Sequence, residues 1–247
     1  MALDRRLALE RVASEGDPWQ VWRAGILADP GPSDPPAIPA QDAEGGFIGP
    51  GGRPSPGATG EALCHLKLLG LSDSGQSAIA ADWLDEVRTP AGAWLDSPDE
   101  IPGELNDLAA PRVWATAAAA AGLLVAGRDP GPRALDLLAG ESDQQGRFTG
   151  GGYPTFAAAA AFWLAQGPKT EITEWALRWS REEGEEWWGP WERASALTFW
   201  LAAGIPSDHP SVQVFLEELR KDAPDSGWPD DLGLTLRTLE LLFLVDG

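Results

Sequence analysis

The sequence is poor in cysteine, in basic residues and in long hydrophobic runs. One cysteine among 247 residues excludes an intramolecular disulfide framework. Only 18 Lys and Arg stand against 38 Asp and Glu, and the net charge of −20 argues against nucleic acid or an anionic membrane surface as partner. The longest uncharged apolar run, residues 113–127, is too short to span a membrane. The first residues lack the apolar core of a secretory signal, so we expect a cytoplasmic protein.

Strand signals are also missing, whereas core-forming residues are plentiful. Alternation of apolar and polar residues over four or more positions is absent, and β-branched residues are few. Hydrophobic residues make up 43% of the chain, which includes 13 tryptophans. The sequence therefore predicts a helical protein, with enough apolar material for one core at this length.

A glycine–aromatic motif recurs along the chain. Each copy is followed by a loop, a hydroxyl residue and an apolar run that ends at a glycine. The motif copies are Gly46-Phe47, Gly92-Ala93-Trp94, Gly146-Arg147-Phe148, Trp187-Trp188-Gly189 and Gly227-Trp228, with Trp19 as a degenerate first copy. The hydroxyl residues are Thr59, Thr116, Thr155, Ser195 and Thr235, and the closing glycines are Gly70, Gly127, Gly167, Gly204 and Gly247.

Two kinds of helix alternate around these motifs. The runs after the hydroxyl residues are apolar on every side, which predicts buried helices with C-terminal glycine caps. The segments before the motifs are amphipathic, and their apolar residues recur at helical spacing. Examples of these stripes are Val212, Phe215, Leu216 and Leu219, and a second set of Ile79, Trp83 and Val87.

About forty residues form one such unit, and six units account for the chain. We therefore predict a single all-α domain over residues 1–247, an (α/α)6 barrel or toroid of six helical hairpins. Its inner ring is expected to be apolar and alanine-rich, and its outer ring amphipathic. The proline-rich segment 29–39 is either a linker or a crossover that replaces part of an outer helix.

This pattern resembles the terpene cyclase/prenyltransferase superfamily, which includes squalene–hopene cyclases and protein prenyltransferase β-subunits. The resemblance rests on the glycine–aromatic turns, of which residues 44–47 (Glu-Gly-Gly-Phe) are closest to the family form, and on the Thr-headed helices that follow. It covers most of residues 40–247 and implies a helical toroid that acts on isoprenoids. Class II cyclases carry an Asp-x-Asp-Asp motif just before an inner-helix Thr, but residues 112–115 here read Arg-Val-Trp-Ala.

Protein prenyltransferases hold zinc with Asp, Cys and His side chains. Here Cys64 and His65 are neighbours that point in different directions on one predicted helix, and no second His lies nearby. We therefore expect no metal site, because open zinc sites need three protein ligands. Cys64 is expected to be a small core residue, and His65 a satisfied or exposed histidine.

The candidate catalytic residues come from the long turn over residues 94–107. A carboxyl cluster above an apolar cavity can raise one pKa and retain a proton for acid catalysis. The alternative is a solvated acidic loop. The candidate acids are Asp96, Asp99, Glu104 and Asp107.

The candidate substrate-binding residues are aromatic. Their rings can stabilise a carbocation, stack on sugars or fill the barrel. They are Trp94, Trp114, Tyr153, Phe156, Trp188, Trp191 and Trp228.

Three functions are compatible with these observations. The first is a terpene cyclase-like enzyme that acts on an apolar isoprenoid in an aromatic cavity, with acid initiation by a turn carboxylate. The others are a non-catalytic binding module on the same fold and a carbohydrate-active (α/α)6 barrel. We expect a small apolar substrate or ligand and no cofactor, with Mg²⁺ possible if the substrate is a diphosphate. The sequence does not determine the oligomeric state.

Overall fold

The computed structural model describes residues 3–29, 31, 34–102 and 109–246. Within these residues the protein has eleven α-helices, one 3₁₀ helix (Pro98–Glu100) and no strand beyond isolated bridges. The α-helices are α1 (Arg5–Glu15), α2 (Pro18–Ala28), α3 (Pro56–Leu68), α4 (Gly75–Glu86), α5 (Ala110–Val125), α6 (Pro132–Gly140), α7 (Gly152–Gln166), α8 (Glu171–Trp187), α9 (Pro190–Ala202), α10 (Pro210–Asp222) and α11 (Leu232–Asp246).

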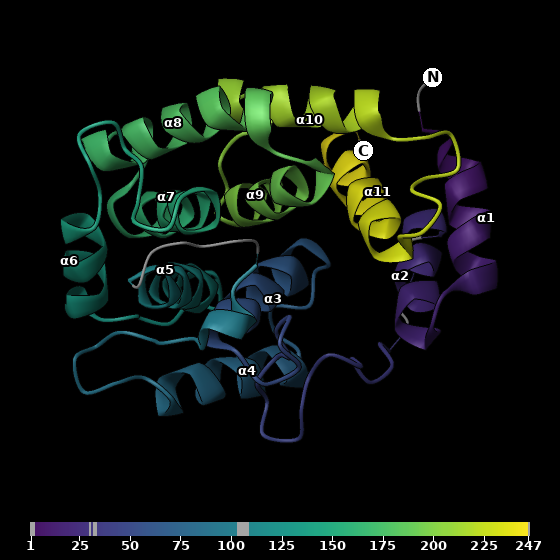
Figure 1. The fold of residues 1–247 in the computed structure, drawn as a ribbon. Coiled ribbons are helices and arrows are strands. Elements are labelled where there is room, and N and C mark those ends of the chain that lie inside the picture. The colour runs from purple at the N-terminus through teal and green to yellow at the C-terminus, as the bar shows by residue number, and fades with distance from the viewer. Residues whose placement is uncertain (1–2, 30, 32–33, 103–108, 247) are drawn as a thin grey trace.

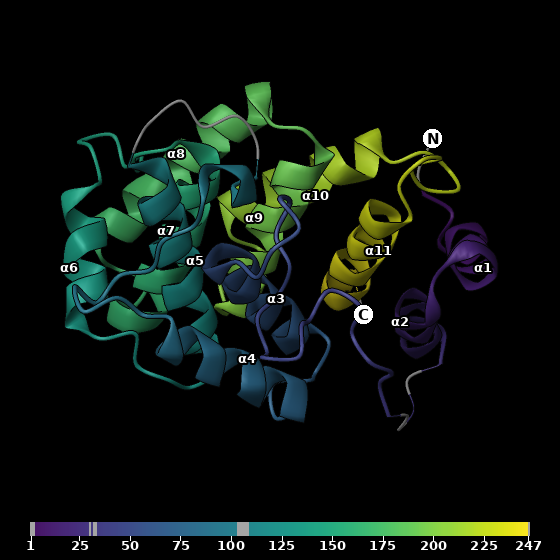
Figure 2. The ribbon, with the colours of Figure 1, turned by 60° about the horizontal axis from the view of Figure 1, so that its bottom comes forward.

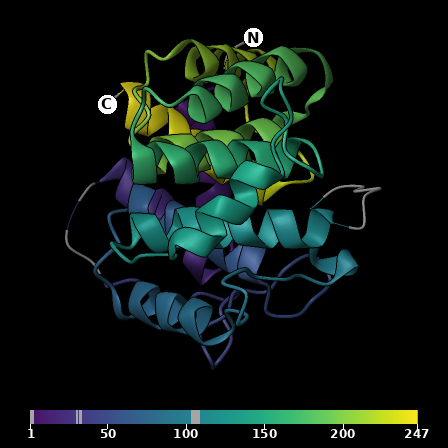
Figure 3. The ribbon, with the colours of Figure 1, turned by 90° about the vertical axis from the view of Figure 1, so that its left-hand side faces the viewer.

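The helices form an inner and an outer layer, which confirms the predicted all-α toroid. Helices α3, α5, α7, α9 and α11 alternate along the chain with the outer helices α4, α6, α8 and α10 (Figure 1). Helices α8 and α10 lie over α7 and α9, and α4 lies on the opposite side against α3 and α5. Figure 3 shows the same arrangement of inner and outer helices from the side.

Helices α1 and α2 form the first hairpin, which lies beside α11 (Figure 2). In the described residues between α2 and α3 (29, 31 and 34–55) there is no helix. The described residues of this stretch therefore connect α2 to α3 without a helix. Proline favours this outcome because it lacks the N–H that a helix interior requires.

The inner helices approach closely because their facing residues are small. Residues 117–121 of α5 and 157–161 of α7 are alanines with no exposed surface. Gly60 of α3 and Gly122 of α5 face each other, and a Cβ at Gly60 would lie 2.1 Å from the carbonyl oxygen of Ala118. Only glycine permits this approach of two backbones.

Helix α3 packs directly against α9 as well as against α5. Helices α3, α5, α7 and α9 therefore enclose a compact apolar group. Helices α2 and α11 close the ring on the other side of α3 and α9. As a result, the interior has an apolar part and a second part between α2, α3, α9 and α11.

The glycine caps are confirmed at four of the five predicted positions. Gly70, Gly127, Gly167 and Gly204 have φ values of +73°, +73°, +88° and +77°, in the left-handed region that ends a helix. Gly247 lies outside the described residues.

One predicted outer stripe is correct and another is partly wrong. Val212, Phe215, Leu216 and Leu219 are fully buried, as predicted. In α4, however, Ile79 and Val87 are exposed, and only Trp83 of the predicted stripe is buried. Because α4 contacts the inner ring through Ala80, Ala81 and Leu84, the buried face of this helix is rotated about its axis relative to the predicted one.

No helix within the described part of the chain is both long and apolar enough to cross a membrane.

Candidate functional site

The hydroxyl residues of the repeat hold the glycine–aromatic turns in place. In four of the repeats the Thr hydroxyl near the start of an inner helix accepts a hydrogen bond from the backbone N–H of the turn aromatic. The donor and acceptor pairs are Phe47 to Thr59 (2.8 Å), Trp94 to Thr116 (3.2 Å), Phe148 to Thr155 (2.9 Å) and Trp228 to Thr235 (2.9 Å). Each turn is thereby fixed above the N-terminal end of an inner helix.

The repeat at Trp187-Trp188-Gly189 is different, because its order is Trp-Trp-Gly and its hydroxyl residue is a serine. The Ser195 hydroxyl donates to Glu61 Oε1 at 2.9 Å instead of anchoring a turn. The changed motif thus coincides with a polar contact inside the ring.

Asp96 follows the turn at Gly92-Ala93-Trp94 and lies at the N-terminal end of α3. Its Oδ2 accepts a hydrogen bond from the backbone N–H of Gly57 at 3.2 Å, and the side chain also bonds to Ser55. Asp96 is 5% exposed. Burial raises the pKa of Asp96 to about 7, although the bonds to Ser55 and Gly57 act in the opposite direction. Its carboxyl group is therefore substantially protonated at neutral pH.

Trp114 lies beside Asp96 on the neighbouring helix α5. A Cβ at Gly57 would lie 2.1 Å from Trp114 Nε1 and 2.6 Å from Asp96 Oδ2, so this glycine leaves the space in which the two side chains meet. Trp114 Nε1 and Asp96 Oδ1 are both buried and have no hydrogen-bond partner among the described residues. Unsatisfied buried polar atoms are rare in native proteins, and here two of them belong to adjacent side chains.

The other predicted acids are placed differently. Asp99 is exposed and forms an ion pair with Arg53 at 2.6 Å. Its neighbour Glu100, which was not a predicted acid, is 2% exposed and accepts bonds from the backbone N–H groups of Gly51 and Arg53, which fixes that loop. Glu104 and Asp107 lie outside the described residues.

Four of the predicted aromatic residues form a connected cluster. Trp114 meets Tyr153 edge-on at 5.7 Å, Tyr153 lies 5.1 Å from Phe156, and Phe156 lies 5.6 Å from Trp188. Trp114 and Phe156 are fully buried, whereas Tyr153 and Trp188 are half-buried. The cluster thus extends from the partly accessible end of the ring to the carboxyl group of Asp96.

The remaining predicted aromatics lie apart from these contacts. Trp94 is fully buried and its Nε1 donates to the Leu84 carbonyl at 2.7 Å, so it holds α4 to the turn. Trp191 is exposed, and its Nε1 donates to Asp231 Oδ2 at 2.6 Å. Trp228 is half-buried against the core.

The structure also contains a buried charged network that the sequence analysis missed. Arg23 donates to both carboxylate oxygens of Glu240, at 2.6 and 2.7 Å. His65 donates from Nε2 to Glu240 at 2.7 Å, and burial together with the nearby arginines lowers the pKa of His65 to about 3. Arg237 donates to Thr198 at 2.8 Å. In the sequence, this network could have been recognised because Arg237 and Glu240 interrupt an otherwise apolar run in an inner helix.

His65 is thus a satisfied core histidine, and its neighbour Cys64 is fully buried, as the sequence predicted. Burial raises the pKa of the Cys64 thiol well above its usual range. Within the described ranges, no three His, Cys, Asp or Glu side chains come together in an arrangement able to hold a metal ion.

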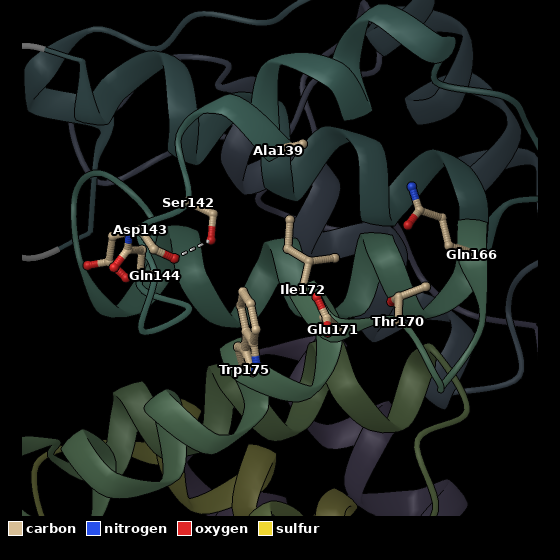
Figure 4. Close-up of a pocket in the computed structure, with 9 residues that line it drawn as sticks. All are labelled: Ala139, Ser142, Asp143, Gln144, Gln166, Thr170, Glu171, Ile172 and Trp175. Atoms are coloured by element: carbon tan, nitrogen blue, oxygen red, sulfur yellow. Dashed lines mark hydrogen bonds between the residues drawn. The ribbon is translucent and has the colours of Figure 1, made fainter.

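A separate pocket of about 540 Å³ lies on the outer ring, between the ends of α6 and α7 and the start of α8 (Figure 4). Ile172 and Trp175 of α8 line it, together with residues of the turn at Ser142 and Asp143. It contains none of the predicted site residues.

Comparison with known proteins supports the fold. No family model matches the chain, and no curated protein matches it. Among solved structures, the fold is similar to that of the type II terpene cyclase MstE from Scytonema in its apo form. The two share 16% sequence identity over 97% of this chain and 86% of that chain, with a TM-score of 0.51. The protein therefore has a terpene cyclase-like helical fold.

Proposed function

We propose that the protein is a terpene cyclase-like enzyme that protonates an apolar isoprenoid, with Asp96 as the acid. The observation that supports this proposal is a buried carboxyl group with a pKa raised to about 7, next to an aromatic cluster. An ionised carboxylate has no proton to donate, whereas a carboxyl group kept neutral by burial can donate one at neutral pH. Asp96 then takes the role for which class II cyclases use the acid of their Asp-x-Asp-Asp motif.

The aromatic residues serve the cation that protonation creates. The proton would form a C–H bond at one alkene carbon and leave a positive charge on the neighbouring carbon. The faces of aromatic rings attract such a charge, most strongly where water is excluded. In this proposal Trp114, Tyr153, Phe156 and Trp188 stabilise the cation until a neighbouring C–H bond breaks, its electron pair forms a new alkene, and its proton passes to water or back to the Asp96 carboxylate.

Substrate entry requires side-chain movement. Trp114 and Phe156 are fully buried, with 1% and 0% of their surface exposed, whereas Tyr153 and Trp188 are partly accessible. We infer that the isoprenoid enters past Tyr153 and Trp188 and displaces the inner rings. The complete burial of Trp114 and Phe156 is also what a filled barrel would show, and it therefore favours the second candidate, a non-catalytic binding module.

The test is incubation of the purified protein with squalene, oxidosqualene, farnesyl diphosphate and geranylgeranyl diphosphate, with and without Mg²⁺, followed by mass spectrometry. We expect a cyclic or rearranged product from the wild type and from Asp82→Asn, an exposed carboxylate on α4. We expect none from folded Asp96→Asn. Full activity of Asp96→Asn overturns the assignment of the acid, and Glu104→Gln and Asp107→Asn then test the other candidates. No turnover of any substrate favours the binding module.

A further inference from the structure

A pocket of about 350 Å³ opens between α2, α3 and the segment around residues 38–47. It lies on a different face of α3 from Asp96. Gly57 and Gly60 face Asp96 and α5, whereas Ala58 and Ala62 line the pocket. The proposed acid and its aromatic cluster are not among the lining residues, so this pocket is separate from the site described above.

The pocket has apolar walls and a charged end. Trp19, Ile38 and Phe47 are core residues that form the walls, and Trp19 is held by a stacked contact with Trp22 at 5.1 Å. The charged lining residues come from three helices. They are Arg23 of α2, Glu61 of α3 and Arg237 of α11, with His65 of α3 beside them as a neutral side chain; Asp17, the N-cap residue of α2, also lines the pocket.

The charges at this end cancel one another. Arg23 is neutralised by its two bonds to Glu240. The Arg237 guanidinium lies between two carboxylates, 3.9 Å from Glu61 and 4.0 Å from Glu240. His65 is neutral, because its pKa is lowered to about 3. An added anion would therefore be an uncompensated charge in a poorly solvated site.

Arg237 nevertheless lacks hydrogen-bond acceptors. A guanidinium has five N–H donors. Among the described residues Arg237 makes one hydrogen bond, from Nη1 to Thr198 at 2.8 Å, and its Nε is buried without a partner. The burial of Nε closes it to a ligand in the pocket, so the remaining N–H donors on the Nη atoms of this partly exposed guanidinium are the ones that can bind an additional neutral oxygen.

We propose that this pocket binds a small uncharged molecule with an apolar body and one acceptor oxygen, which accepts a hydrogen bond from Arg237. The apolar body lies against Trp19, Ile38 and Phe47. This combination of apolar walls with a few polar groups is typical of small-molecule sites. The competing occupant is water, which satisfies the donors but gains nothing from the walls.

Three probes of matched shape test the proposal in NMR titrations of the full chain. 2-Acetylnaphthalene has a ring and an acceptor oxygen, 2-ethylnaphthalene has no acceptor, and 2-naphthoate carries a negative charge. We expect 2-acetylnaphthalene to bind at least about fivefold more tightly than 2-ethylnaphthalene, since a net hydrogen bond contributes about 1 kcal/mol. We expect 2-naphthoate to bind more weakly than 2-acetylnaphthalene.

Two cavity-filling variants locate the binding site. Ala62→Phe fills this pocket from α3, and Ala40→Phe fills it from the exposed segment if the first variant does not fold. Ala13→Phe fills a separate apolar groove between α1 and α2 and is the matched control. Loss of binding in either pocket variant, with wild-type binding in Ala13→Phe, supports the proposal. Equal binding of the first two probes, strongest binding of 2-naphthoate, binding that survives in the folded pocket variants, or no binding of any probe overturns it.

Discussion

At the scale of single residues, Asp96 is the position where opposing effects on one carboxyl group can be compared. A hydrogen bond from the Gly57 N–H, the bond to Ser55 and the N-terminal end of α3 all favour the ionised form. Burial favours the neutral form and prevails, so the pKa rises to about 7. The unpartnered Oδ1 fits this result, because a fully bonded carboxylate would have a low pKa.

The raised pKa predicts how Asp96 affects stability with pH. The folded protein holds this proton up to about pH 7, whereas an unfolded Asp loses it near pH 4. The Asp96 contribution is therefore fully present below about pH 4 and is lost as the pH rises to about 7, by up to about 1.4 kcal/mol per pH unit.

The measurement is urea unfolding of the wild type and Asp96→Asn between pH 4 and 8. The difference between them removes the effects of other groups, such as His65, whose lowered pKa has the opposite sign. We expect the stability advantage of the wild type over Asp96→Asn to shrink across this range. A constant difference would contradict the pKa assigned to Asp96.

The Thr hydroxyls of the repeat give a second prediction at this scale. Thr155→Val leaves the backbone N–H of Phe148 buried without an acceptor, which should lower the free energy of unfolding by about 1–3 kcal/mol. Thr238→Val is the matched control, because the Thr238 hydroxyl is buried without a partner among the described residues. We expect Thr238→Val to be neutral or stabilising. Equal losses in the two variants would show that the turn bond has no specific role.

At the scale of helices, the contact of α3 with α5 depends on the absence of side chains. Gly60 and Gly122 bring the two backbones together, and this contact places Gly57 and Trp114 next to Asp96. The geometry of the candidate site thus follows from the packing of two inner helices.

Gly60→Ala should therefore destabilise the protein despite the higher helix propensity of alanine. Its Cβ would lie 2.1 Å from a backbone oxygen, which α3 can avoid only by moving away from α5. We expect a loss of at least about 1–3 kcal/mol in urea unfolding. Gly25→Ala in α2 is the control, because a Cβ there would meet no atom within 4 Å apart from the adjacent backbone of its own helix, and it should stabilise by about 0.5–1 kcal/mol. Stabilisation by both variants would contradict the close approach.

At the scale of the whole molecule, helices α2 and α11, near the two ends of the chain, are joined by a buried ion pair. Arg23 of α2 and Glu240 of α11 are buried and bonded to each other, and His65 of α3 joins them. This contact closes the ring between segments that lie far apart in the sequence.

Glu240→Gln leaves Arg23 buried without its counter-charge, and we expect a loss of about 3–5 kcal/mol in the free energy of unfolding. Asp246→Asn also removes a carboxylate between the chain ends, where it pairs with Arg5 and Arg220. That pair is partly exposed, so we expect a change below about 1 kcal/mol. A loss in Glu240→Gln no greater than in Asp246→Asn would contradict the role of the network in ring closure.

The sequence predicted the architecture because the repeat is local. Glycine, aromatic and hydroxyl residues lie within one unit, and the alanine runs of α5 and α7 identify buried helices without knowledge of their neighbours. The partner of Glu240, by contrast, lies 217 positions away at Arg23, and no local pattern reveals such a pair. For the candidate site, sequence identified Asp96 and Trp114 separately, but their contact depends on Gly57 and on the crossing of α3 with α5.

The central claim is that Asp96 starts a reaction by protonation, and incubation in D₂O tests it most directly. The Asp96 proton exchanges with solvent, so the wild type should yield an isoprenoid product that carries one deuterium from the medium. Folded Asp96→Asn should yield no such product. A labelled product from Asp96→Asn would assign the acid to another residue, and an unlabelled product or no product from the wild type would contradict the proposed chemistry.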